Sequence, residues 1–294
     1  NFIASPEIVT ALALGGSLSF NPLEDFLETH DGKKIKLSPP LIAPEVPEKG
    51  FVIAENVYIP PSENPEEVEV MIDPNSDRLQ KLEPFKSWNG NDFTELSLML
   101  KAKGKCTTDH ISPAGPWLRL RGHLDNLSDN LLLGAVNAFS NDVGKAKNML
   151  TDKIENCAEI AREYKKQNIS WLIVGDSNYG EGSSREHAAM TPRFLGCVVV
   201  IAKSFARIHE TNLKKQGILA LTFQDTNDYE KINEDDKISI TGLGNFAQGS
   251  VVTCELKHSD GKYEKISLKH SYNSSQIEWF KAGSALNVLK NRKI

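Results

Sequence analysis

A glycine-rich stretch, GDSNYGEGSSREHAAM, spans residues 175–190 and directly follows the apolar run 171–174. A turn of this composition exposes several backbone N–H groups, and a helix that begins there adds partial positive charge. We expect Arg185 in the first turn of that helix, where its planar guanidinium can bind a carboxylate through two hydrogen bonds. Ser183 and Ser184 then lie where an anion is stabilised, so either hydroxyl could act as a general base.

The same stretch also suits an ordinary turn between a strand and a helix. Ser183 or Ser184 would then cap the helix, and Arg185 would lie on its solvent face. The spacing alone leaves both interpretations open. Nucleotide binding fits poorly, because the glycines match neither the dinucleotide fingerprint nor a P-loop with its Lys-Ser/Thr.

A second polar stretch, KGKCTTDHISPAGPWLRLRGHLDN, covers residues 103–126. Asp109 and His110 follow a predicted strand, but neighbouring Asp and His residues make a local hydrogen bond or cap more often than they catalyse. A lone Arg121 is by default a surface charge. Both gain functional weight only if this stretch meets the loop that carries Ser183.

A third stretch, KSFARIHETNLKKQG, covers residues 203–217 and predicts a helix. Ser204 is the expected N-cap and Gly217 the expected C-terminal stop. Arg207 and His209 lie near the start of this helix. A buried or paired His209 in an amphipathic helix explains the pattern better than a catalytic role does.

From about residue 87 onward, short apolar strands alternate with helical patterns. This order predicts an α/β fold with a mixed, largely parallel sheet covered by helices, in which ligands bind at the carboxyl ends of strands. An antiparallel strand set and one last helix should close the chain. The expected strands are 96–106, 171–176, 197–203, 237–242, 250–258 and 263–272, and the expected helices are 124–139, 156–167, 183–196, 204–217 and 274–290.

The first part of the chain has a different character. Ser5 and Pro6 predict the start of a short helix that packs on both sides, and Asp31-Gly32 predicts a hairpin turn. Nine of the fourteen prolines lie between residues 37 and 85, mixed with acidic residues, which is typical of an extended linker. We therefore expect three regions, namely residues 1–36, a proline-rich linker at 37–86, and a domain at 87–294.

Composition narrows the class of protein. A formal net charge of −5 and scattered basic residues favour no nucleic-acid partner, and every apolar run is too short to span a membrane. The cysteines lie far apart without a CxxC pair, which suits reduced intracellular thiols better than a zinc site or a disulfide framework. They are Cys106, Cys157, Cys197 and Cys254, of which the last two are expected in strands of the core. The chain starts at Asn1 without a signal sequence, so we expect it to be part of a longer protein.

These stretches, together with QIEWFKAGSALN near the end, resemble the C-terminal part of the aconitase family, mitochondrial type. The resemblance covers nearly the whole chain, and YGEGSSREHA and SFARIHETNLKKQG are its most specific motifs. It implies that residues 1–36 end the family's third, cluster-binding domain, that 37–86 are its linker, and that 87–294 are its fourth, swivelling domain.

Aconitases interconvert citrate and isocitrate through cis-aconitate with a [4Fe–4S] cluster, so the resemblance also implies roles for single residues. Ser183 matches the catalytic base, and Asp109 matches an aspartate of the active site. Substrate binding is implied for three residues, Ser184, Arg185 and Arg121. His110 and Gly182 are candidate supporting residues.

The chain departs from the family pattern in ways that bear on its activity. It lacks the CxxC pair of the cluster ligands, so we expect the cluster to be ligated by cysteines outside this chain, in the preceding aconitase domains. Alone, this chain should bind no cluster, hold no metal and show no turnover. The resemblance further implies a monomer in the mitochondrial matrix.

Three alternatives stay open at this point. Ser177 stands where the family pattern has Glu, which leaves a homoaconitate hydratase paralogue possible. A small subunit of an isopropylmalate isomerase would share the swivelling fold, although the linker and the segment before it argue against that reading. An RNA-binding or protein-interaction module is the third alternative, and the acidic balance gives it no support.

Overall fold

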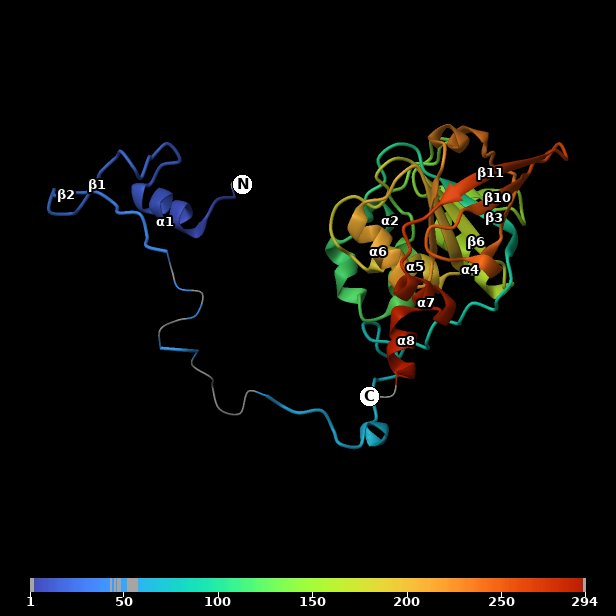
Figure 1. Cartoon of the computed structure of the whole chain (residues 1–294), viewed down its shortest axis with the longest axis horizontal. Helices are drawn as coiled ribbons and strands as arrows, with labels where there is room; N and C mark the ends of the chain where they lie inside the picture. Colours follow the sequence, from blue (N-terminus) through green and yellow to red (C-terminus); the bar gives the residue numbers. More distant parts are fainter. Residues whose placement is uncertain (1–2, 43, 45, 47–48, 52–57, 293–294) are drawn as a thin grey trace. The chain divides into compact units, whose positions relative to one another are not determined.

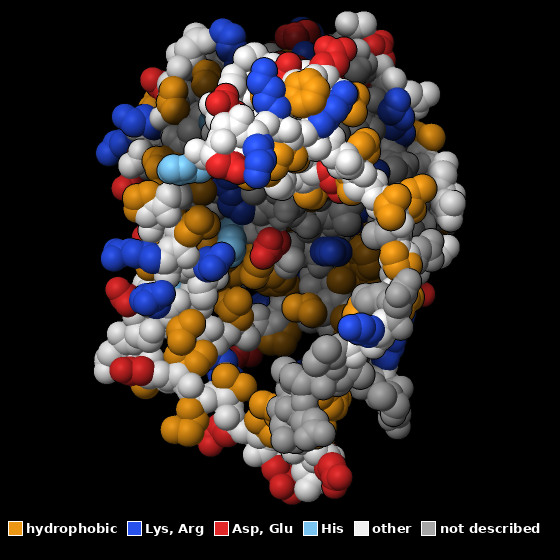
Figure 2. Space-filling model, turned by 90° about the vertical axis from the view of Figure 1, so that its left-hand side faces the viewer, with side chains coloured by type: hydrophobic (Ala, Val, Ile, Leu, Met, Phe, Trp, Pro, Cys, Tyr) orange, Lys and Arg blue, Asp and Glu red, His pale blue; other side chains and the backbone are white. Residues whose placement is uncertain are grey.

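The computed structural model describes the chain except residues 1–2, 43, 45, 47–48, 52–57 and 293–294. Its internal contacts divide the chain into two units, Asn1–Glu69 and Val70–Ile294 (Figure 1). The contacts thus place residues 70–86 with the second unit. Basic and acidic side chains are interspersed with apolar ones on the face drawn in Figure 2.

The first unit contains the predicted helix and hairpin. Helix α1, Pro6–Gly15, begins where the Ser5 hydroxyl accepts a hydrogen bond from the Ile8 N–H at 3.4 Å, and it ends before Gly16 in the left-handed conformation. Strands β1, Leu27–Glu28, and β2, Lys34–Ile35, pair in antiparallel fashion around the predicted turn.

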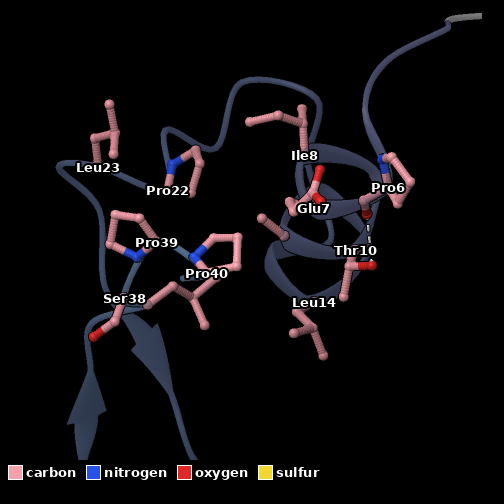
Figure 3. Close-up of a pocket in the computed structure, with 12 residues that line it drawn as sticks. Pro6, Glu7, Ile8, Thr10, Leu14, Pro22, Leu23, Ser38, Pro39 and Pro40 are labelled. Carbon is pink, nitrogen blue, oxygen red and sulfur yellow. Dashed lines mark hydrogen bonds between the residues drawn. The ribbon is translucent and has the colours of Figure 1, made fainter. Parts of the chain in front are cut away.

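Helix α1 does not pack on both sides, since Ala11 is its one buried residue. Instead, Ile8 and Leu14 of this helix line a pocket of about 500 Å³ together with Pro22, Leu23 and Pro39 (Figure 3). The apolar character of α1 is therefore exposed within the first unit.

The second unit is built on one closed, seven-stranded sheet in the order β10-β11-β8-β7-β6-β3-β9. Its parallel strands are β3 Phe93–Lys101, β6 Trp171–Gly175, β7 Cys197–Ala202 and β8 Leu219–Phe223. Its antiparallel strands are β9 Lys237–Thr241, β10 Val252–Lys257 and β11 Tyr263–Lys269. Pairing of β11 with β8 and of β9 with β3 closes the ring. The predicted mixed sheet is confirmed, and the antiparallel strands belong to that same sheet.

Helices cover this sheet (Figure 1), and every residue of β6 and β7 is buried, as expected for parallel strands with both faces covered. The main helices are α4 Cys157–Lys166, α5 His187–Phe194, α6 Arg207–Lys215, α7 Ser274–Ala282 and α8 Ala285–Asn291. Shorter elements are helices α2 Thr108–Ile111 and α3 Leu124–Leu127, the antiparallel pair β4 Lys145–Lys147 and β5 Ile154–Asn156, and 3₁₀ turns at Pro65–Glu67, Gly115–Leu120, Ser128–Asn130, Thr226–Lys231 and Leu243–Asn245. In the described part of the chain, no helix has the length and hydropathy needed to cross a membrane.

The helix predicted over residues 124–139 is wrong in its second half. Regular helical structure ends at Asn130, and the following backbone bonds to α2 instead. The Leu132 N–H donates to the Ile111 carbonyl at 2.7 Å, and the Gly134 N–H donates to the His110 carbonyl at 3.0 Å. Leu132 also has a φ of 55°, which no helix tolerates. Tertiary hydrogen bonds therefore override an apolar pattern that suits a helix.

Two predicted helix boundaries also differ. The last helix is divided into α7 and α8 at Gly283, whose φ is 87° and whose Cβ would lie 2.4 Å from the Lys86 carbonyl oxygen. Helix α6 begins at Arg207 with Ala206 as N-cap, so Ser204 does not cap it. Gly217 follows this helix with a φ of 71°, as predicted.

Candidate functional site

Three loops that follow neighbouring parallel strands lie side by side at one edge of the sheet. The loops after β3 and β6 join where the Gly180 N–H donates to the Cys106 carbonyl at 2.8 Å and the Thr108 N–H to the Glu181 carbonyl at 2.9 Å. The loops after β6 and β7 join through the Tyr179 N–H, which donates to the Ser204 carbonyl at 2.9 Å. The two polar stretches therefore meet, which is the condition under which Asp109 and Arg121 gain functional weight.

Asp176 ties these three loops together. Its carboxylate accepts hydrogen bonds from the Gly104 N–H at 2.9 Å and from the Ser177 N–H at 2.8 Å, and it pairs with the Lys203 ammonium at 3.0 Å. Burial alone would raise the pKa of Asp176, but Lys203 and the two N–H groups outweigh burial, and the net shift of the pKa is downward. The sequence analysis missed this residue, although a carboxylate directly after a buried strand is a signal that could have revealed it.

Ser204 is a second anchor that the sequence analysis assigned to another role. Its hydroxyl accepts a hydrogen bond from the Asn178 N–H at 2.8 Å. The expected capping residue of α6 therefore holds the neighbouring loop at the base of the site.

Asp109 and Arg185 form the central ion pair of the site. The Arg185 Nη1 and Nη2 atoms lie 2.8 and 3.0 Å from the two carboxylate oxygens of Asp109. Arg185 Nη1 also donates to the Ser112 carbonyl at 3.1 Å, and Asp109 accepts a further bond from the Ala114 N–H at 3.1 Å. The hydrogen bond from Arg185 lowers the pKa of Asp109, so this carboxylate is ionised at neutral pH.

The burial of the two partners differs in a way that matters for chemistry. The Arg185 side chain is 14% exposed, whereas the Asp109 side chain is 58% exposed. A bidentate guanidinium pair with one buried partner fixes the position of the cation. The positive charge therefore has a defined place beside the exposed loop that carries the two serines.

Ser183 and Ser184 both lie exposed on that loop, ahead of helix α5. Helix α5 begins at His187, and its N-cap is Glu186 without a side-chain capping bond. Neither serine caps the helix, so the structural alternative for this stretch is wrong. Arg185 likewise precedes α5, which corrects the expectation that it lies in the first turn.

Gly182 gives this loop its shape. Its φ of 112° lies in the region that favours glycine, and a Cβ there would lie 3.4 Å from the Thr108 hydroxyl oxygen, which is ordinary contact. Backbone conformation, more than space, therefore requires glycine at this position. The Thr108 hydroxyl is buried and has no hydrogen-bond partner among the residues that the structure describes.

His110 has a local role. Its N–H donates to the Thr107 hydroxyl at 3.3 Å, and its Nδ1 accepts from the Thr107 N–H at 3.2 Å. This reciprocal cap begins helix α2 and confirms the local alternative for His110. The ring holds the loop on which Asp109 lies.

Arg121 approaches the site from a different element. It follows the 3₁₀ turn Gly115–Leu120, and its side chain is exposed. Burial lowers the pKa of His187, the first residue of α5, whereas Glu186 and the Arg121 backbone raise it, and the charges of Arg121 and Arg185 make smaller contributions that lower it. Asp109 fixes Arg185 ahead of α5, and Arg121 lies exposed on the same 103–126 stretch as Asp109.

His209 packs against the loop that follows strand β6. Its side chain is 2% exposed, its ring centroid lies 5.5 Å from that of Tyr179, and a Cβ on Gly180 would lie 2.1 Å from its Cδ2 atom. Burial lowers the pKa of His209 to about 4, so the ring is neutral at physiological pH. The expected buried histidine is confirmed, whereas Arg207 lies exposed at the start of α6.

The four cysteines do not fit an iron–sulfur cluster. All are buried and free. Burial raises the pKa of Cys106 and of Cys157 to about 12, which keeps these thiols protonated, whereas cluster iron binds thiolates. Within the described ranges, no group of three or more His, Cys, Asp or Glu side chains is placed to hold a metal ion.

Comparison with known proteins defines the class to which this fold and site belong. Residues 96–226 match the family described as the aconitase C-terminal domain. Residues 96–226 thus form an aconitase C-terminal domain, and nearly the whole chain is similar to mitochondrial aconitate hydratases.

Two curated relatives are similar to almost the whole chain. The protein named probable aconitate hydratase, mitochondrial, from Dictyostelium discoideum is 53% identical over 293 residues, which are 99% of this chain and 38% of that protein. The aconitate hydratase, mitochondrial, of Saccharomyces cerevisiae is 51% identical over 289 residues, which are 98% of this chain and 37% of that enzyme. The chain thus spans well under half the length of these relatives.

Among solved structures, a 3-isopropylmalate dehydratase from Methanocaldococcus jannaschii matches 68% of this chain and 93% of its own, with 23% sequence identity and a TM-score of 0.43.

Proposed function

We propose that this chain supplies one half of the active site of an aconitate hydratase, which interconverts citrate and isocitrate through cis-aconitate. The observation that carries the proposal is the ion pair between Asp109 and Arg185. This pair joins the loop of the candidate base, Ser183, to the second polar loop, in a chain about half identical to aconitate hydratases.

The chemistry of such a reaction fits the residues of this edge of the sheet. A proton next to a carboxylate is hard to remove, because negative charge accumulates on the substrate as it leaves. Arg185, fixed by Asp109, would stabilise that charge without reorganising. The same cation favours the deprotonated form of the exposed Ser183 hydroxyl, which would accept the proton.

The remaining polar groups would bind substrate carboxylates. Ser184 lies exposed beside Ser183, and Arg121, exposed on the 103–126 stretch, would supply a second guanidinium. A tricarboxylate offers an anionic group to each of the two arginines. Two separated cations therefore suit this substrate class.

The [4Fe–4S] cluster that the family implies would be held elsewhere in the whole enzyme, since the cysteines of this chain do not fit it. We accordingly expect the chain to act together with the other aconitase domains, in the mitochondrion and as a monomer, and to show no turnover alone.

A hybrid enzyme tests the proposal with this chain. The chain replaces the matching 37% of the Saccharomyces cerevisiae enzyme, and hydration of cis-aconitate is measured by its loss of ultraviolet absorbance. We expect an active hybrid and a loss of kcat of about 10² to 10⁴ in Ser183→Ala, the range of general-base catalysis. Ser170→Ala, at an exposed serine just before strand β6 and so at the opposite end of that strand from the loop of Ser183, is the matched control.

The proposal fails if the hybrid folds and carries its cluster but hydrates no cis-aconitate. It also fails if Ser183→Ala retains the activity of the Ser170→Ala control. Faster hydration of cis-homoaconitate than of cis-aconitate would instead assign the chain to the homoaconitate paralogue.

A further inference from the structure

A short segment at the start of the second unit lies against the loop that carries Arg121. We call this segment, residues 76–80, the strap. Leu79 pairs with Gly122 in an isolated parallel bridge, and the Gln80 N–H donates to the Gly122 carbonyl at 2.9 Å. Gly122 directly follows Arg121, so the strap holds the peptide next to the candidate substrate-binding arginine.

Gln80 also holds this loop with its side chain. Its Oε1 atom accepts a hydrogen bond from the Asp125 N–H at 3.0 Å, in the first turn of α3. One residue thus binds the backbone at two points, Gly122 and Asp125. A further hydrogen bond lies beside it, where Asn126 Nδ2 donates to the Asp77 carbonyl at 3.0 Å.

The contact between strap and loop is close. A Cβ on Gly122 would lie 2.8 Å from the Arg78 carbonyl oxygen and 2.8 Å from Leu79 Cδ2, so only glycine allows this approach. On its other side α3 is held by Arg162, whose Nη1 pairs with Asp125 at 2.6 Å. Arg162 anchors the helix, and the strap anchors the end nearest to Arg121.

We propose that Gln80 is a positioning residue for Arg121, with the strap setting where that guanidinium meets a substrate carboxylate. This inference rests on the proposed function, because it gives Arg121 a substrate to bind. Small displacements of a binding group weaken binding and orientation strongly. The loop of Ser183 is held separately, by Asp176 and by the backbone bonds at Tyr179 and Gly180, so loss of the strap contact acts on substrate binding and leaves proton abstraction intact.

Steady-state kinetics of the hybrid enzyme test this role. Gln80→Ala removes the acceptor for the Asp125 N–H, and we expect the KM for citrate to rise about threefold to tenfold, as one lost hydrogen bond predicts, with kcat within twofold. Gln80→Glu keeps an acceptor oxygen and should restore most of the affinity. Lys81→Ala, at the exposed neighbour, is the matched control and should leave the KM unchanged.

A double-mutant cycle separates positioning from general stability. In an Arg121→Lys background, Gln80→Ala should add less than twofold to the KM, because the group that it positions is already altered. Full additivity of the two substitutions would overturn the inference. An unchanged KM in Gln80→Ala within an active hybrid would overturn it as well.

Amide hydrogen exchange of this chain by itself gives a readout that needs no activity. We expect Gln80→Ala to speed exchange at Gly122–Asn126 and to leave exchange in β6 and β7 unchanged. Unchanged exchange at Gly122–Asn126 would show that the strap does not hold the loop. If the unsubstituted hybrid is inactive, the proposed function fails, and the exchange result alone then decides whether the strap holds the loop.

Discussion

The two arginines of the candidate site are held in different ways. Arg185 is largely buried and makes a two-point ion pair with Asp109. The carboxylate of Asp176 holds the neighbouring loops together, because it accepts hydrogen bonds from two backbone N–H groups and carries a charge. Arg121 is exposed, and neutral hydrogen bonds from Gln80 hold its loop. A charge-assisted two-point bond with one largely buried partner is stronger and more rigid than exposed neutral hydrogen bonds.

The difference suggests a division of labour within one site. A rigid cation beside the base suits charge that develops only in the transition state, because it needs no reorganisation. An exposed cation on a tethered loop suits a substrate carboxylate that is charged throughout the reaction. We therefore expect Arg185 to act mainly on kcat and Arg121 mainly on KM.

Neutralising each arginine in the hybrid enzyme gives the strongest test of this difference between Arg185 and Arg121. Arg185→Gln should lower kcat by about 10² to 10³, the effect of losing one preorganised donor to a developing anion. Arg121→Gln should raise the KM for citrate by a larger factor than it lowers kcat. Steady-state kinetics with citrate and isocitrate measure both, and equal effects on kcat and KM in the two variants would contradict the division.

The buried His209 predicts that the stability of the chain depends on pH. Unfolded His209 binds a proton near its ordinary pKa of 6.5, whereas the folded residue binds one only near pH 4. Stability is therefore full above pH 6.5 and falls as the pH drops toward 4, by up to about 3 kcal/mol.

Urea unfolding of this chain between pH 4.5 and 7.5 measures that slope. His209→Phe keeps an aromatic ring against Tyr179 and should flatten the slope. His30→Asn, at an exposed histidine of the first unit, should leave it as it is. An equally steep slope in His209→Phe would show that the buried ring does not carry the effect.

We expect a smaller loss of stability when Asp176, which joins the loops after β3, β6 and β7, loses its charge. Asp176→Asn keeps one acceptor oxygen but loses the charge that pairs with the partly buried Lys203, and it should lower the free energy of unfolding by about 1 to 3 kcal/mol. Asp260→Asn disrupts the exposed pair with Lys262 at the β10–β11 turn, and it should leave the free energy of unfolding nearly unchanged. Urea unfolding at pH 7 compares the two variants. Equal losses of unfolding free energy would show that Asp176 does not hold the three loops together.

Much of the second unit could be predicted from the sequence, because its signals are local. Buried runs such as 171–175 and 197–202 fix the parallel strands, and topology then brings the loops of Asp109 and Ser183 to one edge of the sheet. The sequence analysis named the meeting of these two loops only as a condition, and the observed order of the parallel strands fulfils it.

The errors share a physical cause, which is competition from contacts far away in the sequence. The helix expected to reach residue 139 ends early because Leu132 and Gly134 bond to α2, and Ser204 gives up capping to hold Asn178. Gly283 divides the last helix because Lys86 lies against it. Nothing local in the sequence reveals these partners, nor the two-point contact of Gln80. The assigned roles of the site residues stay predictions until they are tested.

The central claim is that Ser183 of this chain takes the proton from the substrate. Deuterium exchange into citrate and isocitrate, measured by mass spectrometry with the hybrid enzyme in D₂O, tests that step directly. We predict that Ser183→Ala lowers the exchange rate at the reacting carbon by about 10² or more while citrate binds within twofold of its normal affinity. Exchange that persists at the normal rate in Ser183→Ala would contradict the claim.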